Sequence, residues 1–282
     1  MHLPLHCGAE TSLEEFRIDG NGQFCWHATI KDIDGVPLAG GFGSSQLEAR
    51  SVAYSEFLER REFKAIKSDA DLHQYWGIDL VPTGCGFAVG RDLYSTIIRS
   101  VGEAVERWVR SKWIDEHYKM HRLNPAQVKM SLDPVALALC REFNDVSFFE
   151  KEVAISFSER FFRFKVGAVL AFEGAGVFLG AAVTPGHTKL WRHALVECYR
   201  SLLVSKNNTP TNSFPDNRVR FFGKNAEIGV AMIDRAVNDR WPTPRVLLHR
   251  SKMIEGGEYY LVRTLLDGWT SWHKGDEKRF LY

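Results

Sequence analysis

Residues 49–60 read Ala-Arg-Ser-Val-Ala-Tyr-Ser-Glu-Phe-Leu-Glu-Arg and form the most informative segment of the chain. Its last five residues, Glu56 to Arg60, follow the pattern Glu-x-x-Glu-Arg, which recurs from Glu103 to Arg107. Glutamates three apart share one helix face, where like charges repel by about 0.2–0.5 kcal/mol per pair in water. Two such pairs in similar surroundings indicate that a cation, most simply Mg²⁺, lies between the two helices.

The residues around both copies predict long helices that follow glycine-bearing strand ends. Apolar residues recur at helical spacing from about Ser45 to Ile66, after a strand, turn and strand over residues 24–43. A second helix is expected from about Asp92, a plausible N-cap, to Trp113. The glycine-rich segment 83–90 precedes it.

The rest of the chain predicts further strand pairs and helices. We expect a polar, partly helical insertion at about 115–150, then a hairpin of Lys165–Phe172 with Val177–Val183 and a third helix from about Thr188 to Val204. The last portion predicts a helix near Ala226–Asn238 and a hairpin of Arg245–Arg250 with Tyr259–Leu266. A strand pair followed by a helix, repeated three times, predicts an α/β (α+β) fold in a single domain spanning residues 1–282.

Composition excludes several classes of protein. The 282 residues carry a formal net charge of +1, so bulk charge favours neither a nucleic-acid nor a membrane partner. The five cysteines are scattered without a Cys-x-x-Cys pair, which argues against a zinc site or a disulfide framework and fits reduced thiols in the cytoplasm. We see no signal peptide and no apolar run of about 18 residues that would predict a transmembrane helix.

The simplest reading of one Glu-x-x-Glu-Arg copy is a solvated helix face with internal ion pairs. Apolar neighbours such as Phe57 and Val105 instead place part of this face near the core, where acidic pairs require arginine or metal partners. Glu197 in the third helix is also flanked by apolar residues. The basic residues of the second helix read as a solvated face, on which a peptide leader could dock: Arg99, Arg107, Arg110 and Lys112.

Taken together, these segments resemble the YcaO-like family. The resemblance rests on residues 49–60 with the preceding Gly-Phe-Gly, on residues 83–90 leading into Glu103-Ala104-Val105-Glu106-Arg107, and on His193-Ala194-Leu195-Val196-Glu197. Three segments in this order, covering about residues 35–205, form a fairly specific signature, whereas any one alone does not.

The resemblance implies an ATP site without a P-loop, and the sequence has no such motif. In the family, glutamates from several helices hold Mg²⁺, which in turn holds the phosphates. By position, the implied metal ligands here are Glu56, Glu59, Glu103, Glu106 and Glu197. The residues implied in nucleotide contact or ion pairing are Arg60, Arg107, His193 and Arg200.

The resemblance also implies a reaction and partners. A nucleophile adds to a backbone amide of a ribosomal peptide, ATP phosphorylates the resulting oxyanion, and phosphate leaves to give an azoline, a thioamide or a related product. The implied partners are the peptide substrate, a separate leader-peptide-binding protein and a second copy of the chain in a homodimer.

The chain departs from the family pattern at several positions. Val52 stands where a serine is expected, Ser95 where a glutamate is expected, and His193 and Arg200 where glutamines are expected. The proline-rich C-terminal end typical of azoline-forming members is absent. An alternative therefore stays open: a catalytically inactive scaffold of the same fold that binds a peptide or a partner protein. A more remote one is an unrelated ligase or kinase with a carboxylate–Mg²⁺ site.

Overall fold

The structure is a computed structural model that describes residues 10–17, 24–157, 159–185, 190–206 and 214–268. Two compact units divide the chain: unit 1 comprises the residues up to Ser100 together with Arg250–Arg263, and unit 2 comprises Val101–His249 together with the residues from Thr264 onward. Unit 1 contains β1 (Glu10–Arg17), β2 (Phe24–Lys31), β3 (Pro37–Gly43), α1 (Gln46–Ser68), α2 (Ala70–Trp76) and β4 (Phe87–Gly90).

The remaining elements complete unit 2 or contribute residues to both units. Helix α3 (Leu93–Ile114) begins in unit 1 and continues in unit 2, and β9 (Val246–Ile254) and β10 (Tyr259–Leu266) also have residues in each. Unit 2 further contains β5 (His121–Arg122), α4 (Pro125–Met130), α5 (Pro134–Arg141), β6 (Asp145–Phe157), β7 (Arg160–Glu173), β8 (Gly176–Thr184), α6 (Leu190–Lys206), α7 (Phe214–Phe222) and α8 (Ala226–Asp234).

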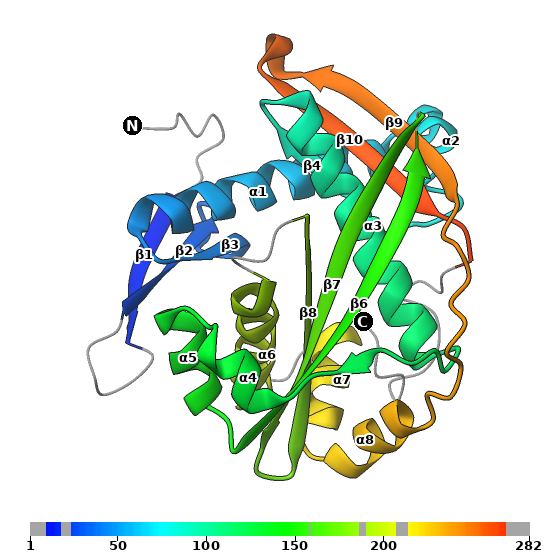
Figure 1. The fold of residues 1–282 in the computed structure, drawn as a ribbon. Helices are drawn as coiled ribbons and strands as arrows, with labels where there is room; N and C mark the ends of the chain where they lie inside the picture. The colour runs from blue at the N-terminus through cyan, green and yellow to red at the C-terminus, as the bar shows by residue number, and fades with distance from the viewer. Residues whose placement is uncertain (1–9, 18–23, 158, 186–189, 207–213, 269–282) are drawn as a thin grey trace. The chain divides into compact units, whose positions relative to one another are not determined.

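In unit 1, α1 packs against the antiparallel sheet β1-β2-β3 (Figure 1). The helix begins where the Ser45 hydroxyl accepts a hydrogen bond from the Glu48 N–H, a normal N-cap. Gly41 of β3 explains the close approach, because a Cβ there would lie 2.4 Å from the Ala49 carbonyl oxygen and from the Ala53 nitrogen. Glycine at this position lets the backbone of α1 approach the backbone of β3.

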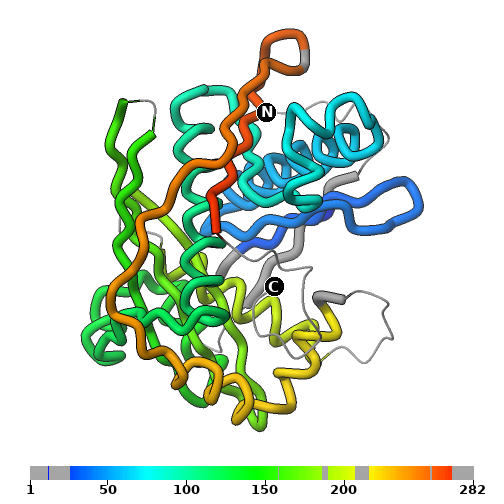
Figure 2. Tube along the Cα trace, turned by 90° about the vertical axis from the view of Figure 1, so that its right-hand side faces the viewer, coloured from blue at the N-terminus to red at the C-terminus, as the bar shows by residue number. Residues whose placement is uncertain are grey.

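The segment between α2 and β4 is held by one buried arginine, Arg263 of β10. Strand β10 pairs with β4 in the antiparallel sheet β4-β10-β9 (Figure 2). Arg263 lies opposite Phe87, and its guanidinium lies over the Phe87 ring at 4.6 Å from the ring centre. The guanidinium donates to four backbone carbonyls, those of Trp76, Val81, Thr83 and Cys85. The C-terminal hairpin therefore fixes the glycine-rich segment that leads into β4.

Unit 2 is built on the antiparallel sheet β5-β6-β7-β8, with α6 against β7 and β8. Gly180 of β8 allows the contact with α6, because a Cβ there would lie 1.9 Å from the Ala194 carbonyl oxygen. Trp108 and Trp113 of α3 are almost fully buried. The Trp108 indole nitrogen donates to the Asp267 carbonyl at 3.1 Å, which ties the end of β10 to α3.

The predicted mixed α/β fold is confirmed, and so are the helices that carry the two Glu-x-x-Glu-Arg copies. Asp92 caps α3 as expected, since its carboxylate accepts from the Ser95 N–H at 2.7 Å. The second expected strand pair is different: β4 is one strand, and its partner β10 comes from the far end of the chain. Local sequence does not specify this long-range pairing.

Several other element boundaries differ from those expected from the sequence. The expected insertion at 115–150 contains β5, α4 and α5, but its last residues already form β6, a long strand that pairs with β7. The helix expected to reach Asn238 ends at Asp234. The expected start of the third helix, at Thr188, lies outside the described residues. The last residues of the chain, from position 269, also lie outside them. The described chain divides into two compact units, and the expectation that residues 1–282 form a single domain stays a prediction.

Candidate functional site

Glu56 and Glu59 of α1, the acidic pair of unit 1, are both half-buried and both engaged by the protein. The Glu56 carboxylate accepts from the Gly40 N–H at 3.3 Å and pairs with Arg60 at 2.5 Å. Arg60 also donates to the Leu38 carbonyl at 2.8 Å. Arg60 therefore links this carboxylate to the strand β3 that α1 covers.

Glu59 is held by residues that are distant in sequence. Its carboxylate accepts from the Val89 N–H at 3.2 Å and from the Arg99 guanidinium at 2.5 Å. Arg99 also donates to the Val89 carbonyl at 3.0 Å. Burial raises the pKa of Glu59 above its ordinary value, while the Arg99 charge and the Val89 hydrogen bond lower it. A bound cation would act in the same direction as Arg99.

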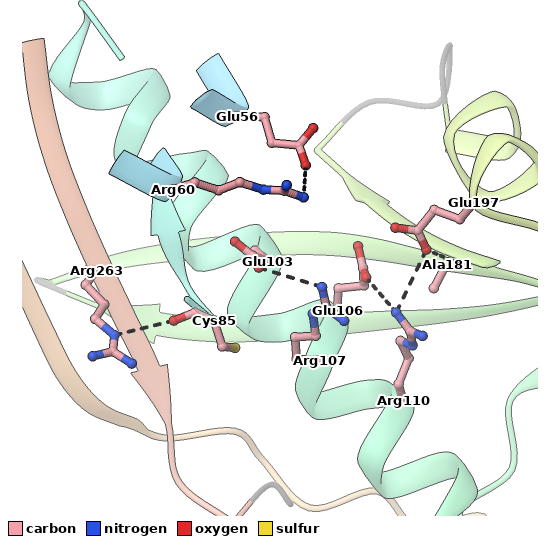
Figure 3. Close-up of polar contacts among 10 residues, drawn as sticks. All are labelled: Glu56, Arg60, Cys85, Glu103, Glu106, Arg107, Arg110, Ala181, Glu197 and Arg263. Carbon is pink, nitrogen blue, oxygen red and sulfur yellow. Dashed lines mark hydrogen bonds and ion pairs between the residues drawn. The ribbon is translucent and has the colours of Figure 1, made fainter. Parts of the chain in front are cut away.

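The acidic cluster of unit 2 consists of Glu103 and Glu106 on α3 and Glu197 on α6. Glu103 lies 3.9 Å from Arg107, both half-buried. Glu106 is buried and pairs with Arg110 at 3.4 Å. Glu197 accepts from the Ala181 N–H of β8 at 3.1 Å and lies 3.9 Å from the same nitrogen of Arg110. Figure 3 shows Arg110 between Glu106 and Glu197.

Burial raises the pKa of Glu106, and the nearby negative charge of Glu197 raises it further. Arg107 and Arg110 oppose this shift through their positive charges. Two carboxylates on different helices thus face each other across one guanidinium. Such an arrangement is stable only with positive charge between the carboxylates, whether it comes from arginine or from a metal ion.

The prediction that the second helix carries a solvated basic face was wrong for two of its residues. Arg110 is only 1% exposed, and Lys112 is also buried and pairs with Glu116 at 2.6 Å. Of the other two, Arg99 is exposed and Arg107 is half-buried, and both engage carboxylates. The positive charges of this helix therefore serve internal carboxylates.

The structure places the other predicted nucleotide contacts on α6, where His193 is exposed and Arg200 is half-buried. Nothing in the structure tests their contact with a nucleotide, so this stays a prediction. Within the described ranges, no group of three or more His, Cys, Asp and Glu side chains is arranged to hold a metal ion. Cys198, next to Glu197, is fully buried with its thiol pKa raised by burial, which argues against a nucleophilic thiol there.

Sequence reasoning missed the roles of Arg99 and Arg110. Arg110 follows Glu106 by four residues, a spacing that predicts a helical ion pair but not its burial. Arg99 pairs with a glutamate forty residues earlier in the chain, for which the sequence offers no local signal. Both arginines were visible only as members of a basic run.

No protein-family model and no curated protein matches the sequence. Solved structures do match. YcaO from Methanopyrus kandleri bound with AMPPCP and Mg²⁺ matches with a TM-score of 0.60 at 12% identity, covering 93% of this chain and 86% of that one. A chain of the E. coli microcin synthetase McbBCD complex with pro-MccB17 bound gives a TM-score of 0.58 at 10% identity, covering 90% and 87%.

A heterocyclase in complex with substrate and cofactor gives a TM-score of 0.55 at 11% identity, covering 92% of this chain and 49% of that one. In the described ranges no helix is long and apolar enough to cross a membrane.

The sequence identities to these solved structures, 10% to 12%, establish the fold alone. The chain has the fold of the YcaO-like proteins.

Proposed function

We propose that this protein is an ATP- and Mg²⁺-dependent enzyme that activates a backbone amide of a ribosomal peptide by O-phosphorylation. The observation that carries the proposal is the placement of three carboxylates from two helices beside two arginines: Glu103 pairs with Arg107, and Glu106 and Glu197 share Arg110. A YcaO structure with the same fold binds AMPPCP and Mg²⁺. The Glu56–Glu59 pair repeats the same local pattern in unit 1.

The donor set fits Mg²⁺. Carboxylate oxygens are the ligands that hard divalent cations prefer, and Mg²⁺ usually completes its shell with water and phosphate oxygens. We propose as metal ligands the five residues Glu56, Glu59, Glu103, Glu106 and Glu197. Bound Mg²⁺ would neutralise the charge that moves between the phosphates and the substrate oxygen.

The arginines paired with these carboxylates supply the second half of the site. A guanidinium presents donors in a fork that matches phosphate oxygens. Arg107 is half-buried beside Glu103 at 3.9 Å, a loose contact that a phosphate could replace. We propose Arg60, Arg107, His193 and Arg200 as the residues that contact the nucleotide.

In the proposed reaction a nucleophile adds to the peptide carbonyl carbon and leaves its oxygen as an oxyanion. The oxyanion takes the γ-phosphoryl group of ATP, and ADP is released. Inorganic phosphate then leaves with the former amide oxygen, which produces an azoline, a thioamide or a related product. Phosphorylation converts a very poor leaving group into a good one.

The proposed partners are a peptide substrate, a separate protein that binds the peptide leader, and a second copy of this chain. The microcin synthetase chain with the same fold belongs to a complex that holds a precursor. The proposed compartment is the cytoplasm, because Cys85, Cys140 and Cys198 are buried free thiols.

Titration calorimetry of the purified protein with AMPPCP and Mg²⁺ tests this function. We expect saturable binding that is lost when EDTA removes the metal. Release of phosphate from ATP that depends on the peptide encoded with this protein would then establish amide activation. Absence of nucleotide binding at millimolar AMPPCP and Mg²⁺ would contradict the proposal.

A specific observation favours a second candidate, the inactive scaffold. Each of the five carboxylates has an arginine nitrogen within 4.0 Å. Internal ion pairs of this kind can stabilise a fold without any ligand. A scaffold would bind its peptide or partner protein with the same affinity in EDTA as in Mg²⁺ and ATP, whereas the enzyme would not release phosphate without them.

A further inference from the structure

Arg110 contacts both members of the Glu106–Glu197 pair. One terminal nitrogen of its guanidinium lies 3.4 Å from a Glu106 oxygen and 3.9 Å from a Glu197 oxygen. The two glutamates come from α3 and α6, so a single positive group joins two helices that are not consecutive in the chain. A divalent ion that bridged these two carboxylates would join the same two helices.

The side chain of Arg110 is both buried and permanently charged. The side chain is 1% exposed, and arginine does not lose its proton in proteins. A buried guanidinium requires nearby acceptors or negative charges that compensate for the hydration it has lost. Glu106 and Glu197 provide this compensation, and in return the Arg110 charge opposes the repulsion between them.

The charges of the unit 2 cluster show what Arg110 changes. The three carboxylates Glu103, Glu106 and Glu197 face the two guanidiniums of Arg107 and Arg110, which leaves one net negative charge. Without Arg110 the cluster would carry two net negative charges. The attraction between a divalent cation and such a site rises with its charge and with its burial. Arg110 therefore lowers the affinity of these carboxylates for a free metal ion.

We infer that Arg110 is a built-in cation that holds Glu106 and Glu197 in place in the metal-free protein and weakens the binding of free divalent cations there. Resting on the proposed function, the consequence is that Mg²⁺ binds to these carboxylates together with nucleotide phosphates, which contribute further negative charge. Arg110 lies next to Oε1 of Glu106 and Oε2 of Glu197. Arg110 is thus a positioning residue.

Thermal unfolding in increasing Mn²⁺, without nucleotide, tests this inference on wild type and Arg110→Gln. The wild-type midpoint should respond weakly to Mn²⁺. Arg110→Gln should unfold at a lower temperature without metal, and Mn²⁺ should restore its midpoint, with an apparent affinity at least about tenfold above wild type because one buried positive charge has been removed. Adding Glu197→Gln to this variant should abolish the response to Mn²⁺.

Lys112→Gln is the matched control, since Lys112 is a buried cation of the same helix that pairs with Glu116 outside the cluster. Its response to Mn²⁺ should equal that of wild type. Equal responses of Arg110→Gln and wild type would overturn the inference. If Arg110→Gln does not fold, the wild-type protein still provides a test. The inference would be overturned if wild type binds Mn²⁺ alone as tightly as it binds Mn²⁺ together with AMPPCP. Because the variant test contains no nucleotide, its failure is distinct from failure of the proposed ATP-dependent activity.

Discussion

Arg99 and Glu59 together hold both backbone groups of one residue in β4. The Arg99 guanidinium donates to the Glu59 carboxylate at 2.5 Å and to the Val89 carbonyl at 3.0 Å, and Glu59 accepts from the Val89 N–H at 3.2 Å. A carboxylate with two such partners has little rotational freedom. Strand β4 therefore orients Glu59, one of the proposed metal ligands, through Val89.

Replacement of Arg99 by glutamine should lower the free energy of unfolding by about 1 kcal/mol, a modest value because the arginine side chain is 49% exposed. Glu59 would lose its cationic partner while it stays desolvated. Urea unfolding measures the loss. Arg61→Gln is the control, since Arg61 pairs with Glu62 on α1. An equal loss in both variants would show that the Arg99–Glu59 contact has no special role in unit 1.

Replacement of Arg263 by methionine should destabilise the protein by at least about 3 kcal/mol, because buried carbonyls would lose a charged donor. The affected carbonyls belong to Trp76, Val81, Thr83 and Cys85. Hydrogen exchange should also become faster in residues 83–87. Arg245→Met, which removes an 80% exposed arginine paired with Asp267, should cost less than about 1 kcal/mol. Similar losses in both variants would contradict the assigned role of Arg263.

Local sequence predicted the helices of the candidate site well. Helix α1 starts near Ser45 as expected, and α3 starts at its expected N-cap, Asp92, because short polar side chains satisfy the first free N–H groups of a helix. The partial burial of Glu56 and Glu103 follows from the apolar residues around them. These features depend on neighbours within a few residues, which a sequence displays directly.

The features that the sequence did not reveal depend on distant contacts. Strand β4 pairs with β10, and Arg263 of β10 reaches back to the carbonyl of Cys85. The burial of Arg110 is decided by packing around α3, whereas its spacing from Glu106 is the same in a solvated helix. Sequence pattern therefore located the carboxylates but not the arginines that neutralise them.

The double variant Glu103→Gln/Glu106→Gln should abolish binding of AMPPCP with Mg²⁺ while the protein stays folded. Glutamine keeps the shape of each side chain but loses the negative charge that a divalent cation requires. Calorimetry measures binding, and circular dichroism checks the fold. The control is Glu116→Gln, since Glu116 follows the end of α3 and pairs with Lys112. This variant should bind the nucleotide as wild type does. Undiminished binding in the double variant would exclude these glutamates as ligands.

Replacement of Gly180 by alanine should cost at least about 2 kcal/mol, because the new methyl group would overlap the backbone of α6. Its carbon would lie 1.9 Å from the Ala194 carbonyl oxygen and 2.9 Å from the Cys198 sulfur. Displacement of α6 should also weaken the bond between Glu197 and the Ala181 N–H, and with it nucleotide binding.

The control for this variant is Gly84→Ala, where the added carbon would meet only the Phe63 ring at 3.9 Å, an ordinary contact. We expect its stability to stay within about 1 kcal/mol of wild type. Chemical denaturation of both variants gives the comparison. A Gly180→Ala protein as stable as Gly84→Ala would mean that α6 does not lie as closely on β8 as the structure describes.

The raised pKa of Glu106 makes a prediction about pH. Burial and the Glu197 charge lift this pKa above the ordinary value of 4.5, against the opposing effect of Arg107 and Arg110. A raised pKa in the folded state gives a stabilising contribution that is fully present below 4.5 and is lost as the pH rises through the folded-state pKa. Glu106→Gln has no proton to lose there.

The free energy of unfolding of Glu106→Gln should therefore rise relative to wild type as the pH increases from below 4.5 toward neutrality. Urea unfolding at a series of pH values, without divalent cations, measures this difference. The same series on Glu116→Gln gives the effect of removing a carboxylate outside the cluster. A difference for Glu106→Gln that falls with pH would mean that Arg107 and Arg110 outweigh burial, so that Glu106 is ionised more readily in the folded protein than in the unfolded chain.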